Sequence, residues 1–360
     1  MEPLIERIRA ARTSRTRLSI RGGGTKSFYG EAAQGETLDV TGVRGISSYE
    51  PTELVVTARC GTPLAELERT LAGAGQCLPF EPPHFGPDAT VGGMVAAGLA
   101  GPARAAVGGV RDYVLGATLL DGRGEVLSFG GQVMKNVAGY DVARLLAGSL
   151  GTLGVICEVS LKVLPLARAT ATLRFEINQA DALRQLNNWA GQPLPLNASA
   201  WWSGVLVVRL QGAVAAVDAA RARLGGEVIA TDVAQTFWAG LREQTDEFFA
   251  AAQRAIDADP TRRLWRLSLP STAAPFGSQA GEQLVEWGGA QRWLCTDAPA
   301  AELRAAAVAA GGHATIFRAR DKSPGVFTPP AAPLSRIQRE LLRAFDPDAV
   351  FDAGRLAPGT

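Results

Sequence analysis

The chain of 360 residues is long enough for two domains, and its 47% hydrophobic and 20% charged content is that of a folded protein. A net charge of +1 excludes the broad positive field by which nucleic-acid-binding proteins neutralise phosphates, so any anion must be bound by local groups. Four separated cysteines without a C-x-x-C pair give no support to a zinc ribbon or an iron–sulfur cluster, and they indicate a reducing compartment.

Residues 1–20 carry no uninterrupted apolar run of the kind found in a secretory signal peptide. The most apolar stretch, residues 89–100, is too short and too rich in glycine to cross a bilayer. We therefore expect a soluble, cytoplasmic protein without a transmembrane segment.

Short β-like runs alternate with glycine clusters over residues 1–165, and the runs are 17–22, 38–42, 53–61, 114–131 and 154–165. Within the fourth run, the pair Asp121-Gly122 predicts a hairpin with a tight turn.

Two helices are predicted in the same region. Residues 62–75 place Leu64, Leu67 and Leu71 at helical spacing, with Thr62 as the expected N-cap and Pro63 in the first turn. Residues 141–148 predict a short helix that begins at an aspartate cap, Asp141.

The composition shifts after residue 165, and residues 170–317 contain two passages of similar pattern. Each combines β-like runs with helical stretches, which are expected near 180–190, 213–224 and 298–310. This pattern predicts an antiparallel sheet with helices on one face. All seven tryptophans lie in 189–293, either in the core of this region or on a partner surface. A proline-rich connector, 321–333, then leads into a C-terminal helix and tail.

The stretch RGGGTK, residues 21–26, raises the question of an anion site. Successive glycines let backbone N–H groups converge on an anion, and Arg21 and Lys26 add positive charge. The other interpretation is a turn with two solvated cations. The sequence lacks both the Walker A pattern and the G-x-G-x-x-G pattern of nicotinamide-binding folds, which leaves nucleoside triphosphates and nicotinamides without support.

Two further small-residue stretches favour a bound cofactor over a plain turn. Residues 87–101 are richer in glycine and alanine than an ordinary core helix, so a flat ligand could approach the backbone there. Close helix packing would select the same residues. Residues 145–156 again bring glycines to the start of a β-like run.

Ordered motifs carry a family resemblance at this point. They are RGGGTK (21–26), P-x-A-T-V-G-G-M-V-A (87–96), G-G-V-R-D (108–112), KNVAGYDVARLLAGSLGTLGVI (135–156) and FDPDAVFDAGRL (345–356). Together they resemble the FAD-binding domain of the p-cresol methylhydroxylase/vanillyl-alcohol oxidase (PCMH/VAO) superfamily. With FEPPHFG (80–86), they resemble more narrowly the FAD-binding subunit of bacterial glycolate oxidase (glycolate dehydrogenase). The resemblance is dense over 15–165, thin over 170–330, and returns over 345–356.

The resemblance implies a set of FAD-binding residues. The first glycine loop would bind the FAD pyrophosphate through Arg21, Gly22, Gly23, Gly24, Thr25, Lys26, Ser27 and Gly30. The second stretch would line the pyrophosphate, ribose and flavin through Thr90, Val91, Gly92, Gly93, Ala96 and Gly98. Matching positions further along are Gly108, Arg111, Gly154, Val155 and Ile156, the last three on the adenine or ribose side. A buried pyrophosphate needs such N–H donors and cations.

The sequence also departs from the family pattern. The tail has Asp352-Ala353 where the superfamily usually has Asn-Pro. His84 does not match a site of covalent flavin attachment, so we expect non-covalent FAD. Relatives that oxidise 2-hydroxy acids hold the substrate through a metal that several histidines of the cap domain bind. The corresponding part of this chain, residues 170–330, contains His313 as its single histidine. We therefore predict no metal site and assign no catalytic residue; His313 is either a general base or structural.

The resemblance further implies fold, partners and function. The predicted fold is α+β, a two-subdomain PCMH/VAO-type FAD-binding domain (1–168), a smaller α+β cap domain built as a ferredoxin-like repeat (169–330), and a C-terminal helix and tail (331–360) that return to the first domain. We expect the FAD-binding subunit of a glycolate oxidase complex, with a larger FAD-containing catalytic subunit, an iron–sulfur subunit and membrane association only through these partners. The alternatives are an assembly subunit with a vestigial FAD site, or a stand-alone flavin oxidase.

Overall fold

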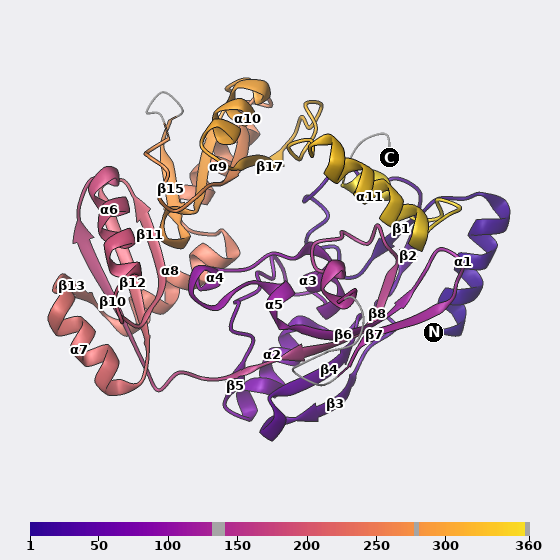
Figure 1. The fold of residues 1–360 in the computed structure, drawn as a ribbon, viewed down its shortest axis with the longest axis horizontal. Helices are drawn as coiled ribbons and strands as arrows, with labels where there is room; N and C mark the ends of the chain where they lie inside the picture. The colour runs from indigo at the N-terminus through magenta and orange to yellow at the C-terminus, as the bar shows by residue number, and fades with distance from the viewer. Residues whose placement is uncertain (132–140, 277–280, 357–360) are drawn as a thin grey trace. The chain divides into compact units, whose positions relative to one another are not determined.

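The computed structural model describes residues 1–131, 141–276 and 281–356. The chain forms two compact units. Unit 1 comprises Met1–Leu99, Gly109–Leu166 and Pro329–Thr360, and unit 2 comprises Ala100–Gly108 and Ala167–Thr328. The architecture is the predicted mixture of helices and sheets (Figure 1).

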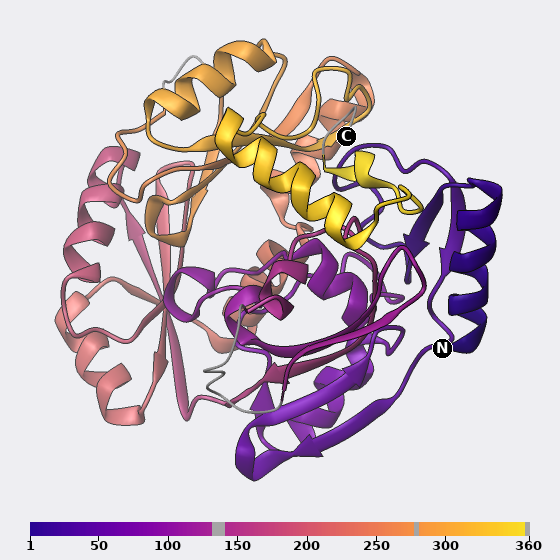
Figure 2. The same ribbon diagram turned by 45° about the vertical axis from the view of Figure 1, so that its right-hand side comes forward.

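The first part of unit 1 is a helix packed on a short parallel strand pair. Helix α1 (Glu2–Ser14) lies alongside β1 (Leu18–Arg21) and β2 (Glu36–Asp39), as Figures 1 and 2 show. Ile8 of α1 and Leu18 of β1 are fully buried in one apolar cluster, which also includes Phe351 from the C-terminal tail. Phe351 forms a parallel bridge with Leu18, so the tail is held beside the strand from which the glycine loop starts.

The larger sheet of unit 1 has the strand order β3-β4-β8-β6-β7 among the described residues. Its strands are antiparallel: β3 (Ile46–Glu50), β4 (Val55–Arg59), β6 (Val114–Leu120), β7 (Val126–Gly130) and β8 (Val155–Lys162). The hairpin predicted at Asp121-Gly122 is confirmed, because β6 pairs with β7 across it. The buried Asp121 carboxylate accepts the backbone N–H groups of Arg123 and Glu125 and so orders the turn.

Short elements complete unit 1. They are the 3₁₀ turns η1 (Pro51–Glu53), η2 (Ala143–Leu146) and η5 (Ala353–Arg355), the strand pair β5 (Gln76–Cys77) and β9 (Leu164–Pro165), and the helices α2 (Leu64–Gly73), α3 (Val91–Ala97), α5 (Val110–Tyr113) and α11 (Ala332–Phe345). Helix α2 forms where the leucine spacing predicts it, and Leu64, Leu67 and Leu71 are fully buried. Each such side chain contributes about 2 kcal/mol of transfer free energy.

Two predicted helix starts differ from the structure. Thr62 does not cap α2, because its hydroxyl bonds both the N–H and the carbonyl of Gly45, and Pro63 takes the N-cap position instead. The segment after Asp141 forms the 3₁₀ turn η2 in place of the predicted short helix, with Val142 at its N-cap. The Asp141 carboxylate nevertheless accepts the backbone N–H of Arg144 at 3.4 Å, which is the kind of bond that a capping aspartate makes. Asp141 still pairs with Arg144, at 2.9 Å.

Unit 2 is built on one antiparallel sheet with the order β13-β10-β12-β11-β15-β16-β14-β17 among the described residues. The first half contains β10 (Ala169–Glu176), β11 (Leu196–Trp202), β12 (Val205–Gly212) and β13 (Glu227–Ile229). The second half contains β14 (Arg263–Ser268), β15 (Gln283–Glu286), β16 (Gln291–Thr296) and β17 (His313–Ala319). Pairing of Ala200 with Glu286 and of Trp201 with Val285 joins the halves.

Helices cover both faces of this sheet, so the prediction of helices on one face is wrong. Helices α6 (Gln179–Ala190) and α7 (Val214–Leu224) pack in a cluster with Leu173 of β10. Its neighbour Thr172 points to the opposite face, where its hydroxyl bonds Trp238 of α8 (Thr231–Glu243). The second half repeats this arrangement, because α10 (Ala300–Ala309) covers Leu294 and α9 (Glu247–Ala258) packs Phe249 against Trp293.

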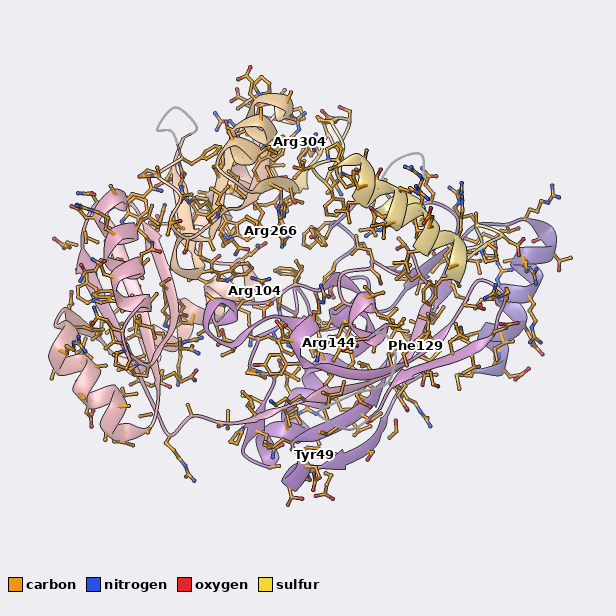
Figure 3. The ribbon with its side chains drawn as sticks, in the orientation of Figure 1. Tyr49, Arg104, Phe129, Arg144, Arg266 and Arg304 are labelled. Atoms are coloured by element: carbon orange, nitrogen blue, oxygen red, sulfur yellow. The ribbon has the colours of Figure 1, made fainter. Side chains whose placement is uncertain are left out.

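Residues 100–108, which the sequence interpretation assigns to the first domain, belong to unit 2. They include helix α4 (Arg104–Val107), and the Arg104 guanidinium lies 4.7 Å from the centre of the Trp287 ring in the turn η4 (Trp287–Gly289). Arg104 is labelled in Figure 3. The Trp287 indole N–H donates to the carbonyl of Gly101 at 3.1 Å.

The tryptophans of unit 2 belong mainly to its core. Trp189, Trp238, Trp265 and Trp293 are buried, and the other three are partly buried. In the part of the chain that the structure describes, each helix falls short of the length and apolarity that a bilayer crossing demands.

Candidate functional site

The glycine loop after β1 lines a small pocket in unit 1 of about 100 Å³. The pocket brings together four separate parts of the sequence. Its lining residues are Ile20, Arg21, Gly22, Gly23, Gly24, Thr25, Lys26, Ser27, Thr90, Gly93, Ala96, Ala97, Leu150 and Arg355. The first two glycine stretches singled out by sequence therefore meet at one site.

Glycine is required in the loop because another segment lies directly against it. A Cβ built on Gly23 would lie 1.5 Å from the carbonyl oxygen of Asp88, and one on Gly22 would lie 2.4 Å from the Thr90 hydroxyl. Gly24 has a φ of +73°, a conformation that side chains disfavour. The backbone of the glycine loop therefore packs directly against residues 88–90, with no room for side chains at Gly22 and Gly23.

Thr90 links the loop to the helix that follows it. Its hydroxyl accepts the N–H of Gly93 at 3.2 Å and so caps α3. Met94 and Val95 of this helix are buried in unit 1, whereas Gly93 and Ala96 line the pocket. One side of α3 therefore anchors the helix and the other presents small residues to the pocket.

The pocket lining is strongly cationic. It contains Arg21, Lys26 and Arg355, and none of its lining residues is acidic. Lys26 donates to the carbonyl of His84 at 3.1 Å, which fixes the ammonium beside the pocket. Positive side chains beside glycine backbone match a ligand that carries concentrated negative charge.

Arg355 reaches the pocket from the C-terminal tail. Its guanidinium donates to the carbonyls of Tyr29 at 2.5 Å and Glu31 at 2.8 Å, with a longer bond to Ser27 at 3.4 Å. Its own carbonyl accepts the N–H of Glu31 at 3.1 Å. Burial lowers the pKa of Arg355 from its ordinary value. The tail thus clamps the segment that follows the glycine loop.

Several predicted site residues lie outside the pocket. Gly30 lies next to Leu150 and Arg355, while Val91 and Gly92 are buried, with Gly92 against Cys60. Gly98 ends α3 against Gly148. The remaining residues do not line this pocket either: Arg111 is exposed on α5, Gly154 directly precedes β8, which begins with Val155 and Ile156, and Gly108 belongs to unit 2. Their assignments stay predictions.

Four lining residues are absent from the predicted set of FAD-binding residues. Ile20 and Ala97 are neighbours of residues in that set, so a wider window would have included them. Leu150 lies within the third glycine stretch, and Arg355 lies within the tail motif, although neither was assigned a role. Residues 135–140 of the fourth family motif lie outside the described residues.

The two histidines lie in different environments. His84 pairs with Glu68, with 2.9 Å between Nε2 and Oε2, close to the pocket loop. His313 begins β17 opposite Ser268, and partial desolvation, then the charge of Arg266, lower its pKa. The described residues contain no group of three or more His, Cys, Asp or Glu side chains placed to hold a metal ion.

Comparison with known proteins places this geometry in a family. The FAD binding domain family matches residues 1–130. Glycolate oxidase subunit GlcE of Escherichia coli (strain K12) is 48% identical over 355 residues, which cover 99% of this chain and 97% of that protein. The chain belongs to the GlcE family.

A relative named as another glycolate oxidase subunit matches the GlcE-family chain over less of its length. Glycolate oxidase subunit GlcD of Bacillus subtilis (strain 168) is 31% identical over 140 residues, 39% of this chain and 30% of that protein. Both names describe subunits, so each of these proteins is part of a multi-subunit enzyme. Two structures of alkyldihydroxyacetonephosphate synthase share the fold, with TM-scores of 0.63 and 0.64 at 14% identity, over 97% of this chain and 74% of theirs.

This GlcE-family chain is therefore an FAD-dependent oxidoreductase subunit whose fold and cofactor agree with the sequence prediction. The pocket fits part of that cofactor. Its small volume, bare glycine backbone and three cations match a diphosphate rather than an entire dinucleotide.

Proposed function

We propose that this chain is the FAD-binding subunit of a glycolate oxidase (glycolate dehydrogenase) complex that oxidises glycolate to glyoxylate. In this proposal the other components are a larger FAD-containing catalytic subunit and an iron–sulfur subunit that receives the electrons. The observation that carries the proposal is the 48% identity to GlcE over almost the whole of both chains. We further propose that FAD binds without a covalent bond and that the complex works in the cytoplasm, with membrane association only through its partners.

The residues of the pocket have separate tasks in this proposal. Gly22, Gly23 and Gly24 present backbone N–H groups to the pyrophosphate, and Arg21 and Lys26 balance its charge. Arg355 keeps the following segment closed on the loop. When bound, FAD accepts two electrons and releases them one at a time, which suits a position between a hydroxy acid and an iron–sulfur carrier.

Two other functions compete with this proposal. An assembly subunit with a vestigial site would keep the fold without retaining FAD. A stand-alone flavin oxidase would need its own substrate-binding groups. The pocket favours a working FAD site, because Arg21, Lys26 and Arg355 line it and none of its lining residues is acidic.

Flavin content of the intact complex distinguishes these functions. We expect the complex purified from the native source to contain one acid-released FAD per copy of this chain, in addition to the flavin of its catalytic partner. Glycolate should bleach the flavin of the complex but not that of the isolated chain. A complex whose only flavin belongs to the partner would favour the assembly role, and bleaching of the isolated chain would favour a stand-alone oxidase.

A further inference from the structure

Residues 81–86 form a loop that lies directly against the glycine loop of unit 1. The ring of Phe85 meets that of Phe28 edge-on, with 5.4 Å between their centres. The Lys26 ammonium lies 5.7 Å from the centre of the Phe85 ring and donates to the His84 carbonyl at 3.1 Å. The position of one pocket cation therefore depends on the position of this loop.

The backbone of the loop has an unfavourable conformation. Glu81 and Phe85 have φ values of 48° and 53°, in the left-handed region that side chains disfavour. A segment of this kind keeps its shape only where the surrounding structure holds it. Something outside the loop must therefore fix the His84 carbonyl in front of Lys26.

The His84 side chain supplies such an anchor. Its Nε2 lies 2.9 Å from Oε2 of Glu68, and only 15% and 29% of the two side chains are exposed. Glu68 belongs to α2, which is itself fixed in unit 1 by its fully buried leucines. A continuous series of contacts thus runs from the core through Glu68 and His84 to Lys26.

We propose that His84 is a positioning residue for FAD binding: its ring, tied to Glu68, holds its own carbonyl where it orients the Lys26 ammonium toward the pyrophosphate. The inference rests on the proposed pyrophosphate role of the pocket and assigns a role to a histidine that the family motifs leave unexplained. His84 acts through Lys26 and need not touch the cofactor.

A double-mutant cycle tests this indirect action. The probe is FAD itself, titrated into the deflavinated full chain while the quenching of flavin fluorescence is followed. We expect Lys26→Ala to weaken FAD binding by roughly tenfold or more, since it removes a charged donor. His84→Ala should weaken binding by about fivefold when Lys26 is present. In the Lys26→Ala background, His84→Ala should have almost no further effect.

Three other variants test whether the effect of His84→Ala arises from its contact with Glu68. Glu68→Ala should reproduce the loss caused by His84→Ala, because it removes the same anchor. His84→Gln keeps a side-chain donor for Glu68 and should restore most of the affinity. Arg69→Ala changes the exposed neighbour of Glu68 on α2 and should leave FAD binding unchanged. Thermal unfolding of each variant shows whether the fold is retained.

The outcomes separate this inference from the proposed function. If His84→Ala or Glu68→Ala weakens FAD binding equally with and without Lys26, or has no effect, the positioning role is wrong while the FAD site stands. If the wild-type chain itself binds no FAD, the proposed function is wrong.

Discussion

Arg355 shows how one side chain near the end of the chain shapes the candidate site. The tail motif is recognisable in the sequence, but nothing local to it indicates that its arginine lies beside residues 27–31. That proximity arises because Phe351 bridges to Leu18, more than 300 residues away in the chain. The glycine loop was predictable because backbone without side chains is itself the functional feature, whereas a distant clamp depends on the complete fold.

Replacing Arg355 should loosen the segment next to the pocket. Arg355→Ala removes a charged donor from three carbonyls, and we expect FAD affinity to fall about tenfold. Arg355→Lys keeps the positive charge but loses the forked geometry of the guanidinium, so its FAD affinity should lie between those of wild type and Arg355→Ala. Arg343→Ala, on the exposed side of α11, is the matched control. Equal flavin titrations for all four proteins would contradict the clamp.

At the scale of elements, the local sequence pattern predicts some helices correctly and does not predict others. Helix α2 follows from its leucine spacing, because its buried face depends on its own sequence. Its predicted cap failed because Thr62 bonds Gly45 of another segment. The sequence pattern does not predict helices α8 and α9, so it also does not predict that the second face of the sheet is covered.

The buried carboxyl of Asp346 gives a pH prediction for the turn after α11. It accepts the N–H groups of Val350 and Phe351, and burial raises its pKa above the ordinary value. Its stabilising contribution is therefore complete below the unfolded pKa of about 3.9 and is lost as pH rises through the folded pKa. Asp346→Asn, which cannot ionise, should gain stability relative to wild type as pH rises from acidic to neutral.

Urea unfolding of both proteins across this pH range measures the difference. Asp346→Ala serves as a reference: like Asp346→Asn it cannot ionise, and because it has no side-chain acceptor it should be less stable than Asp346→Asn by about 2 kcal/mol at every pH. If the stability of Asp346→Asn relative to wild type does not change with pH, or falls as pH rises, the assignment is wrong.

At the scale of the whole molecule, contacts between residues far apart in the sequence determine the sheet and the composition of the two units. Two passages of similar pattern were recognised, but their union in one sheet depends on pairing of Ala200 with Glu286. The sequence places residues 100–108 in the first domain because motifs of that domain flank them, yet Arg104 and Gly101 pack on Trp287 in unit 2. Neither outcome follows from local periodicity.

Cysteine reactivity provides a test of the packing of unit 1. Burial raises the pKa of Cys60 to about 12 and that of Cys157 to about 11, so both thiols stay protonated at pH 8. Iodoacetamide should modify Cys60 and Cys157 more than tenfold more slowly in the folded chain than in the chain unfolded by urea. Mass spectrometry measures the extent of modification at each cysteine. The partly buried Cys77 and Cys295 should react earlier. Early modification of Cys60 would contradict the core described here.

The amount of FAD bound per chain in wild type and in Gly23→Ala tests the central claim most directly. The added methyl group would collide with the Asp88 carbonyl, whereas Gly73→Ala, with nothing within 4 Å of the new Cβ, is a matched control. We predict close to one FAD per chain for wild type and Gly73→Ala, and at least a tenfold loss of FAD affinity for Gly23→Ala with its fold retained. Full FAD occupancy in Gly23→Ala at the same affinity would contradict the assignment of this loop to the cofactor.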